Sequence, residues 1–348
     1  MKKLNYAIIG CGVFGGTHAR ALSTIKEANI VAVCDTYIEK CKALNEKFQL
    51  EAACYSNYMD MLEKEQIDIV VVATSDKEHK DASIAALKTN HHVMCEKPMS
   101  LFTEDCIEMI KAADEAHKLL MVGQVCRCTP AFIKAKELVD NGVIGELCFA
   151  ESEYAHDYSR AFGTDNWRVD KDREPIIGGA CHAIDLLRWI AGDPYETTAY
   201  SNHKMLTDWP VDDTTIAIMK FPNNVIGKVF TSIGCKRNYT MRTVLYGTKG
   251  TIIVNNSDSH FTLFLEKENE NGGNLGDVSN KTVAHEIPVV VNNHNVPEEH
   301  KQLIDAVMKN KPLVTTGREG AKTVIACRAV VDSAKTGKSV KIDYGAVK

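Results

Sequence analysis

The feature that most limits how this chain can fold is a glycine-rich turn, Gly10-Cys11-Gly12-Val13-Phe14-Gly15, placed between a short apolar run and a helix-patterned segment. In such a turn the first glycine permits a tight bend, the second lets the backbone approach a pyrophosphate, and the third lets helix and strand pack closely. The helix N-terminus then offers free N–H groups and partial positive charge to phosphates. The turn therefore predicts a dinucleotide site with Gly10, Gly12, Val13, Phe14 and Gly15 as its first contacts.

An acidic residue follows at the end of the next predicted strand. Asp35 stands about twenty residues after the last glycine, where a carboxylate can accept hydrogen bonds from ribose hydroxyls. A negative charge there repels the 2′-phosphate of NADP, and no arginine follows it in Asp35-Thr36-Tyr37-Ile38. We therefore expect NAD as the cofactor, in preference to NADP.

Around this turn, short β-branched runs alternate with helix-patterned segments. The run 69–73 is apolar throughout, as expected for a strand buried on both faces of a parallel sheet. Six strands alternating with helices predict a doubly wound Rossmann domain over residues 1–123. The predicted strands are 6–9, 30–34, 52–55, 68–73, 92–95 and 119–122, and the predicted helices are 17–25, 38–48, 81–88 and 103–117.

After residue 123 the pattern changes to longer strands with polar-apolar alternation, typical of an antiparallel sheet with one packed and one open face. The segment Glu266–Asn280, rich in asparagine, glycine and charge, predicts a mobile hairpin or loop. We thus expect an α/β protein whose second domain, 124–348, is α+β with a large, mainly antiparallel open sheet. Its predicted strands are 147–156, 196–203, 214–221, 225–233, 240–246 and 251–254, and its helices are 132–141, 298–309 and 320–336.

Composition excludes several classes of function. The formal net charge is −5 and like charges form no block, which argues against nucleic-acid and membrane-surface partners. The apolar run Tyr6–Ile9 is too short for a signal peptide, and no stretch approaches the ~18 apolar residues of a membrane span. The twelve cysteines include no CxxC pair and indicate reduced thiols, so we expect a cytoplasmic protein without a metal site.

Several short motifs follow one another along the rest of the chain. They are Glu96-Lys97-Pro98 after the fifth strand, Gln124 with Arg127 and Pro130, Asn166-Trp167-Arg168, and His182 with Asp185 on a predicted helix. Together with the glycine turn, Val72-Ala73-Thr74 before His79, and the closing segment 332–338, they make the whole chain resemble the glucose–fructose oxidoreductase / inositol dehydrogenase family.

The resemblance implies a nicotinamide pocket formed by Thr74, Glu96 and Lys97, with Lys97 reaching the reacting hydroxyl. It also implies a substrate cavity roofed by the open sheet. The remaining cofactor contacts that we expect are Ser75, His79, Gln124, Trp167 and Arg168. The positions of these residues along the chain agree with such a pocket, because strands four and five end at the sheet edge where cofactor and substrate meet in such folds. A lysine before a proline is also held in an extended or cis turn, which fixes its direction.

His182 and Asp185 are spaced to lie on one face of a helix, and an imidazole suits proton abstraction from a carbinol near neutral pH. We therefore expect Lys97 and His182 to be catalytic. Many family members carry an aspartate four residues before this histidine, where the present chain has Gly178. Either Asp185 or another acid substitutes for it, or His182 and Lys97 work as a pair. The departure also argues against inositol dehydrogenase as the specific activity.

The expected substrate ligands, besides Lys97 and His182, are Arg127, Tyr154, His156 and Asp185. The leading hypothesis is NAD-dependent oxidation of a ring hydroxyl of a sugar, glycoside or cyclitol, with ring carbon 3 as the expected position. A second hypothesis keeps the site but makes the net reaction redox-neutral, with tightly bound NAD. A third is a NAD-binding regulator that has lost catalysis. An open sheet with an apolar face also predicts a homodimer or homotetramer.

Overall fold

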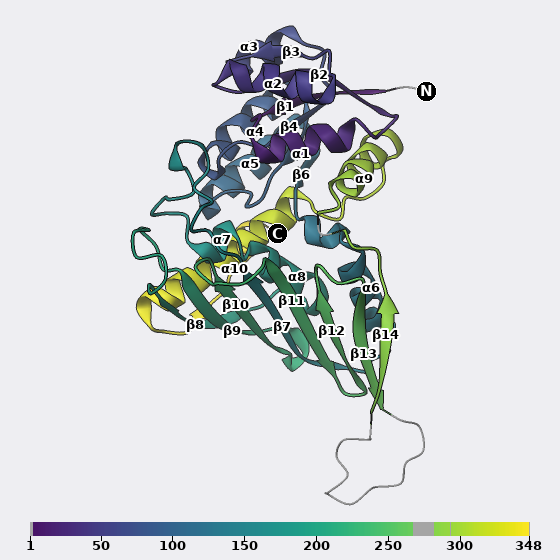
Figure 1. The fold of residues 1–348 in the computed structure, drawn as a ribbon, viewed down its shortest axis with the longest axis vertical. Helices are drawn as coiled ribbons and strands as arrows, with labels where there is room; N and C mark the ends of the chain where they lie inside the picture. Colours follow the sequence, from purple (N-terminus) through teal and green to yellow (C-terminus); the bar gives the residue numbers. More distant parts are fainter. Residues whose placement is uncertain (1–2, 267–281, 293, 348) are drawn as a thin grey trace, which may run out of the picture.

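The computed structural model describes residues 3–266, 282–292 and 294–347 of the 348-residue chain. Two sheets organise the molecule, with the N-terminal sheet above and the C-terminal sheet below in Figure 1, and helices between them. This arrangement confirms the predicted fold class.

The N-terminal sheet has six parallel strands in the order β3-β2-β1-β4-β5-β6, the order of a dinucleotide-binding doubly wound fold. The prediction missed one short helix, α3, and the other predicted elements are present with ends shifted by a few residues. The strands are β1 (Leu4–Ile9), β2 (Ala28–Cys34), β3 (Ala53–Tyr55), β4 (Ile69–Val72), β5 (His92–Cys95) and β6 (Leu120–Val122). The helices are α1 (Val13–Leu22), α2 (Ile38–Phe48), α3 (Tyr58–Lys64), α4 (His79–Lys88) and α5 (Thr103–Ala116), with a 3-10 turn, η1 (Asp76–Glu78).

In the part of the chain that the structure describes, the C-terminal sheet has nine strands in the order β14-β13-β12-β11-β7-β10-β9-β8-β15. All neighbours are antiparallel except β7 and β10. The prediction found six of these strands and missed β13, β14 and β15; beyond Glu266, the predicted hairpin lies outside the described residues. The strands are β7 (Leu147–Ala155), β8 (Glu196–Asn202), β9 (Thr214–Lys220), β10 (Ile226–Ser232), β11 (Thr240–Gly247), β12 (Gly250–Asn255), β13 (His260–Glu266), β14 (Thr282–Pro288) and β15 (Val340–Lys341).

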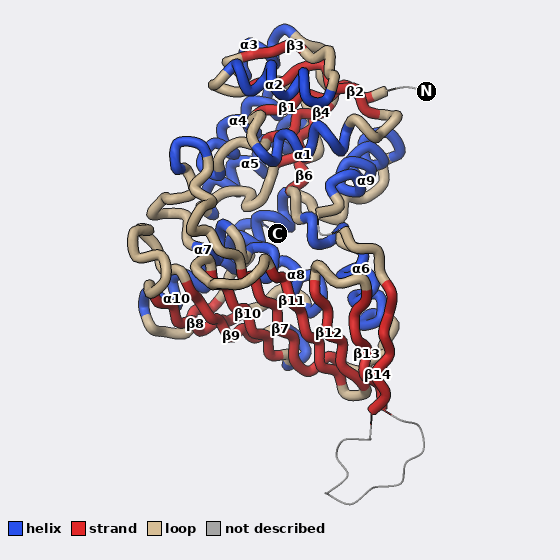
Figure 2. Tube along the Cα trace, in the orientation of Figure 1, coloured by secondary structure: helices blue, strands red, loops and turns tan. Residues whose placement is uncertain are grey.

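Within the described ranges, helices cover only one face of this larger sheet, as the tube in Figure 2 helps to follow. Along β9, Ala217 and Met219 are buried while Ile216 and Ile218 are exposed, so the opposite face is open. The helices and turns of this half are η2 (Val125–Cys128), α6 (Pro130–Asp140), η3 (Thr164–Asn166), α7 (Pro175–Gly178), α8 (Cys181–Ala191), η4 (Pro222–Asn224), α9 (Val296–Lys309), α10 (Gly317–Thr336) and η6 (Gly345–Val347).

The last two long helices return to the N-terminal sheet. Helix α9 packs on α1, and its Leu303 and Ile304 belong to the same hydrophobic cluster as strand β1. Helix α10 packs on α5 and β6 as well as on β8, and the Thr316 side chain caps it by accepting a hydrogen bond from the Glu319 N–H. The C-terminal part of the chain therefore ties the two sheets together. No helix among the described residues is both long and apolar enough to cross a bilayer.

Gly320 shows how closely α10 approaches the parallel sheet. A Cβ at this position would lie 2.5 Å from a methyl carbon of the buried Val122 side chain. Gly320→Ala gains about 1 kcal/mol of helix propensity but forces a β-branched side chain to shift, and overpacking costs about 1–3 kcal/mol. We expect a net loss of stability, seen as a lower thermal unfolding midpoint. Asp332→Ala, on the exposed side of the same helix, should leave the midpoint unchanged; equal midpoints for both variants would contradict the close packing.

Candidate active site

The glycine turn forms a cradle between β1 and α1. Gly10 has a φ of +95°, and a Cβ there would lie 2.5 Å from the carbonyl oxygen of Ala73; a Cβ on Gly15 would overlap the Gly10 carbonyl. A Cβ on Gly12 would meet nothing, so this position faces open space. No side chain caps α1, and its first turn holds no acidic residue. The free N–H groups at this helix start therefore fit a pyrophosphate.

Asp35 is held at the end of β2 beside this cradle. Its carboxylate accepts hydrogen bonds from the backbone N–H groups of Cys11 and Tyr37, both at 2.9 Å. The ammonium of Lys40 lies 3.8 Å from one of its oxygens. The sequence thus places the acid next to the glycine turn, where a ribose would follow the pyrophosphate.

Three buried side chains, starting with Glu96 of the Glu96-Lys97-Pro98 turn, form a hydrogen-bonded chain. Glu96 Oε1 is 2.9 Å from His18 Nε2, and His18 Nδ1 is 2.9 Å from His300 Nε2. His18 lies on α1 and His300 on α9, and both are fully buried. The chain therefore joins the glycine-turn helix, the end of β5 and a helix from the C-terminal part of the sequence.

The charges along this chain can be assigned. Burial and then the neighbouring His18 place the pKa of His300 well below its ordinary value, so this imidazole is neutral. Its Nδ1 has no partner among the described residues, so the assignment that fits donates its proton from Nε2 to His18 Nδ1. His18 then donates to Glu96. Burial alone would raise the pKa of Glu96, but His18 and Lys97 outweigh it and hold the carboxylate ionised.

Glu299, the residue before His300, adds a second buried carboxyl group. Neither of its oxygens has a partner among the described residues. Burial and then the charge of Glu96 raise its pKa well above its ordinary value, so it is a neutral acid. The junction therefore carries one negative charge, on Glu96, beside Lys97.

Lys97 follows Glu96 through a backbone turn that ends in a cis Lys97–Pro98 peptide bond. Its ammonium lies 5.5 Å from the centre of the Phe14 ring, on the helix of the glycine turn. No carboxylate within ion-pair distance of Lys97 is found among the described residues. The side chain is half-buried, so its charge acts on the groups around it, including three imidazoles: His156, His182 and His294.

His182 lies in the first turn of α8 and is 2% exposed. Burial, then Lys97, then His294 lower its pKa well below its ordinary value, so the imidazole is neutral. Its Nδ1 is buried without a partner among the described residues. The neighbouring rings are Tyr154 at 6.2 Å and His294 at 6.4 Å between centroids. A neutral, unpaired imidazole near a lysine ammonium is the arrangement that an alcohol oxidation needs.

Sequence reasoning missed His294. It lies in the segment between β14 and α9, with its ring 6.3 Å from Phe14 and stacked on Tyr239 at 6.2 Å. No periodicity marks an isolated loop histidine, so the sequence held no signal for it. His18 had a weak signal, because it falls on the buried face of α1 together with Ala19 and Leu22.

Of the other predicted cofactor residues, His79 and Thr74 form hydrogen bonds within the protein, whereas Gln124 has no partner for its amide among the described residues. The His79 imidazole bonds the Pro98 carbonyl at 2.9 Å and so supports the Lys97 turn from below, while Thr74 donates to the Ser75 carbonyl. Gln124, directly after β6, is buried with both amide atoms unpartnered among the described residues. Such an orphaned amide fits a bound polar group. The roles of these residues toward a cofactor stay predictions.

Trp167 and Arg168 lie on the segment between β7 and α7, which reaches across to the N-terminal half. The Tyr37 hydroxyl donates to Asp165 at 2.8 Å, and Lys77 pairs with Asp170 at 2.8 Å. These contacts hold the segment beside Tyr37, two residues after Asp35. Arg168 stacks on the Trp167 ring at 4.8 Å, and its buried Nε has no partner among the described residues. Both residues remain predicted cofactor contacts.

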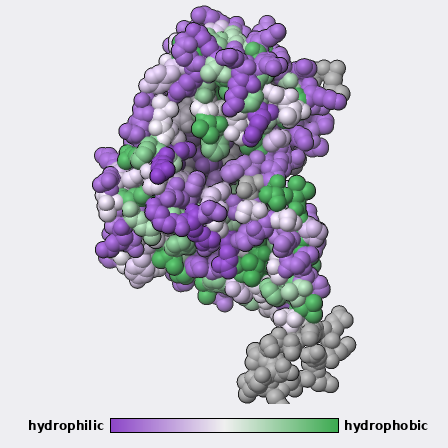
Figure 3. Space-filling model, viewed as in Figure 1, coloured by the Kyte–Doolittle hydropathy of each residue, from purple (hydrophilic) through white to green (hydrophobic). Residues whose placement is uncertain are grey.

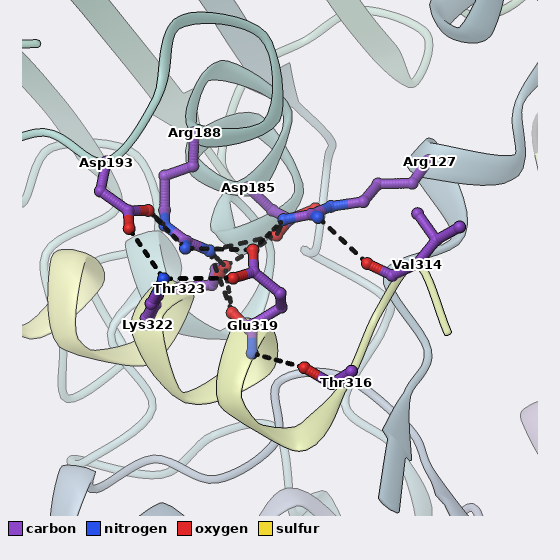
Figure 4. A network of polar contacts seen from close by, with 9 residues as sticks. All are labelled: Arg127, Asp185, Arg188, Asp193, Val314, Thr316, Glu319, Lys322 and Thr323. Carbon is purple, nitrogen blue, oxygen red and sulfur yellow. Dashed lines mark hydrogen bonds and ion pairs between the residues drawn. The ribbon is translucent and has the colours of Figure 1, made fainter. Parts of the chain in front are cut away.

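The predicted substrate ligands Arg127 and Asp185 bind each other instead of standing free. Arg127 donates to both Asp185 oxygens, at 2.8 and 2.7 Å, and both side chains are buried (Figure 4). Arg188 and Glu319 join the same network, which Figure 4 shows linking α8 to α10. Tyr154 and His156, by contrast, lie on β7 and just after it, near His182. The substrate role of all four stays a prediction.

Comparison with known proteins agrees with this geometry. Residues 4–124 match the model described as an oxidoreductase family with an NAD-binding Rossmann fold, and residues 132–253 match the GFO/IDH/MocA C-terminal domain. Myo-inositol 2-dehydrogenase of Thermotoga maritima is 26% identical over 98% of this chain and 99% of its own. The 2,7-anhydro-N-acetylneuraminate hydratase of Escherichia coli is 28% identical over 72% of this chain and 67% of its own.

Among solved structures, levoglucosan dehydrogenase in complex with NADH and levoglucosan superposes with a TM-score of 0.86. It is 21% identical and covers 99% of this chain and 100% of its own. A likeness at that identity supports the fold of the whole chain.

The Asp185 network yields a test of what that carboxylate does. Asp185→Asn leaves two buried guanidinium groups facing each other with less negative charge, and breaking a buried ion pair costs about 3–5 kcal/mol. We expect a clear fall in the unfolding midpoint. The matched control is Asp114→Asn, which breaks a half-exposed pair with Arg318 and should cost at most ~1 kcal/mol. Unchanged stability with a raised KM for substrate would instead support the substrate-ligand prediction.

Proposed function

Because the chain belongs to the GFO/IDH/MocA oxidoreductase family, with its NAD-binding Rossmann fold, we propose that it oxidises a ring hydroxyl of a sugar, glycoside or cyclitol with NAD. The observation that carries the proposal is that the charge of Lys97, from the cofactor half, acts on the neutral, unpaired imidazole of His182 from the other half.

The two side chains divide the work on the hydroxyl. The Lys97 ammonium donates a hydrogen bond to the hydroxyl oxygen and stabilises the negative charge that develops there. The His182 imidazole, neutral in its surroundings, accepts the hydroxyl proton. Bound NAD⁺ supplies the acceptor for the hydride that leaves the ring carbon. The ionised Glu96, fixed by His18 and His300, is the residue before Lys97, and its charge would stabilise the cationic nicotinamide ring of NAD⁺ if the ring were bound beside it.

The cofactor preference rests on Asp35. Its two oxygens already accept backbone hydrogen bonds, and a 2′-phosphate would bring two further negative charges to the same carboxylate. We therefore propose NAD and not NADP. Ring carbon 3 of a pyranose or glycoside remains our expected position of oxidation, supported by the resemblance of the Gly178–Trp189 stretch to other family members.

A second candidate function keeps the same residues but returns the hydride, so that the net reaction is redox-neutral. Relatives named as 2,7-anhydro-N-acetylneuraminate hydratases, at 28% identity, favour keeping it. Purified protein that carries bound NAD, converts a sugar and releases no NADH into solution would support this candidate. Steady accumulation of free NADH would support the dehydrogenase.

The open sheet face supports an assembly of several copies. Large apolar side chains are exposed on it in a patch that includes Tyr200, Ile216 and Ile218, and Tyr200 and Ile216 are directly opposite on neighbouring strands. Figure 3 shows hydrophobic residues among hydrophilic ones over the lower half of the molecule, where Figure 1 places the larger sheet. We propose that residues 124–348 form the substrate-binding domain, and that this face pairs with the same face of another copy. Within this substrate-binding domain, Arg127 and Asp185 pair with each other and hold α8 in place.

The catalytic assignment predicts the behaviour of two variants. Lys97→Met and His182→Ala should each lower kcat by about 10²–10⁴ because each removes a group that acts on the reacting hydroxyl. The affinity for NAD, measured by calorimetry, should change only a few-fold. Lys111→Met and His260→Ala, both on exposed surface, serve as matched controls. Variant rates equal to those of the controls would sink the assignment.

The oligomer proposal predicts that a charge on the open face separates the copies. Ile218→Glu places a carboxylate in the centre of the patch, and burying it against a second copy is strongly unfavourable. Sedimentation should show a smaller species than the wild type. Met59→Glu, an equally exposed site on α3, should leave the assembly intact. A wild type that is monomeric at every concentration would refute the proposal.

A further inference from the structure

Where the family resemblance places an aspartate, this chain has Gly178, and the guanidinium of Arg173 occupies the space that a side chain there would need. A Cβ on Gly178 would lie 2.5 Å from Cζ of Arg173, and 2.5 Å from its Nη1. Heavy atoms do not approach so closely, so this position has room for a side chain only if the guanidinium moves. The missing carboxylate is thus replaced, in space, by a cation.

Arg173 is firmly held in this place. Its Nε donates to Asp76 at 2.7 Å, and its Nη2 donates to the Gly178 carbonyl at 3.1 Å. One face of the guanidinium lies 5.0 Å from the Trp167 ring. Asp76 belongs to the turn after β4 in the N-terminal half, and both members of the pair are about 95% buried. The ion pair therefore connects the two halves directly beneath the site.

A pair of tyrosine hydroxyls, on Tyr154 and Tyr158, lies within electrostatic range of this guanidinium. The Tyr154 and Tyr158 hydroxyls are 2.8 Å apart, and the Tyr154 hydroxyl is 3.3 Å from Nδ1 of His156. Burial raises the pKa of Tyr154 well above its ordinary value, although Arg173 acts to lower it, so the phenol stays protonated. A Cβ on Gly179 would lie 2.5 Å from the Tyr154 ring. The Gly178-Gly179 pair thus leaves space for Arg173 on one side and Tyr154 on the other.

The proton direction along this row follows from His156. Burial, and then Arg168, lower the pKa of this half-buried histidine, so it is neutral. If Tyr158 donates to Tyr154 and Tyr154 donates to His156 Nδ1, the imidazole carries its own proton on Nε2. The row then offers a neutral N–H donor on His156, whose ring is 6.1 Å from that of Tyr154, and the Tyr154 ring is in turn 6.2 Å from that of His182. Sugar hydroxyls accept hydrogen bonds from such donors without any charge being buried.

We propose that Arg173 is a positioning residue that takes the place of the family carboxylate, and that it fixes the row Tyr158–Tyr154–His156 as the part of the site that recognises substrate hydroxyls. This inference rests on the proposed polyol oxidation. The Tyr158 hydroxyl then determines specificity indirectly, because it orients Tyr154 and His156, the two groups that contact the sugar.

Tyr158→Phe tests the row without disturbing the fold, because it removes one oxygen. We expect KM for the sugar to rise about tenfold, the equivalent of one hydrogen bond, with KM for NAD and kcat changed much less. Tyr246→Phe, on the open sheet face, is the matched control and should leave all three constants unchanged. A Tyr158→Phe enzyme that behaves like the control overturns the inference while the proposed oxidation stands.

A double-mutant cycle tests the role of Arg173. Gly178→Ala and Arg173→Ala should each raise KM for the sugar about tenfold or more, and the double variant should be no worse than either, because the added methyl group then occupies vacated space. Arg173→Lys, which keeps the charge, should recover part of the loss. Fully additive effects overturn the positioning role. A wild type that oxidises no polyol overturns the proposed function together with this inference.

Discussion

The buried, ionised Glu96 joins three separate segments of the chain through His18 and His300. A buried carboxylate keeps its charge only when neighbouring groups stabilise it, and here His18 does so, itself held by His300. The two histidines are 282 residues apart in the sequence. The cofactor half is therefore incomplete without α9, and the return of the chain from the second sheet to α1 has a chemical reason as well as a packing one.

A second buried network of paired side chains joins separate segments of the chain in the other half of the site. Arg127, Asp185 and Glu319 join η2, α8 and α10, so the helix that carries His182 is fixed against the helix that packs on β6 (Figure 4). Lys97 lies in the turn after β5 of the first sheet, and His182 lies on α8, which packs on β7 of the second sheet. Charges that are paired and buried hold the helices around the site, and two of the groups without a hydrogen-bond partner there among the described residues, Lys97 and the neutral His182, are those that we propose act on a hydroxyl.

The sequence was most informative where local rules decide the structure. The glycine turn, the apolar run of β4 and the acid at Asp35 predicted the parallel sheet and its dinucleotide edge, because strand burial and backbone sterics are readable within a few residues. It was least informative about contacts between distant segments. His294, Arg173 and the His18–His300 bond carry no periodic signal, and Arg127 and Asp185 looked available as ligands because their mutual pairing depends on tertiary packing. Strands β13 and β14 were missed as well.

Isotope labelling can follow the proposed transfer of hydride from a ring carbon to the nicotinamide. A pyranose or cyclitol deuterated at the reacting carbinol carbon would be mixed with the protein and NAD⁺, quenched within one turnover, and the cofactor examined by mass spectrometry. We expect deuterated NADH from the wild type and almost none from Lys97→Met. Unlabelled NADH, or NADH formed only from hydroxy acids or amines, would contradict it.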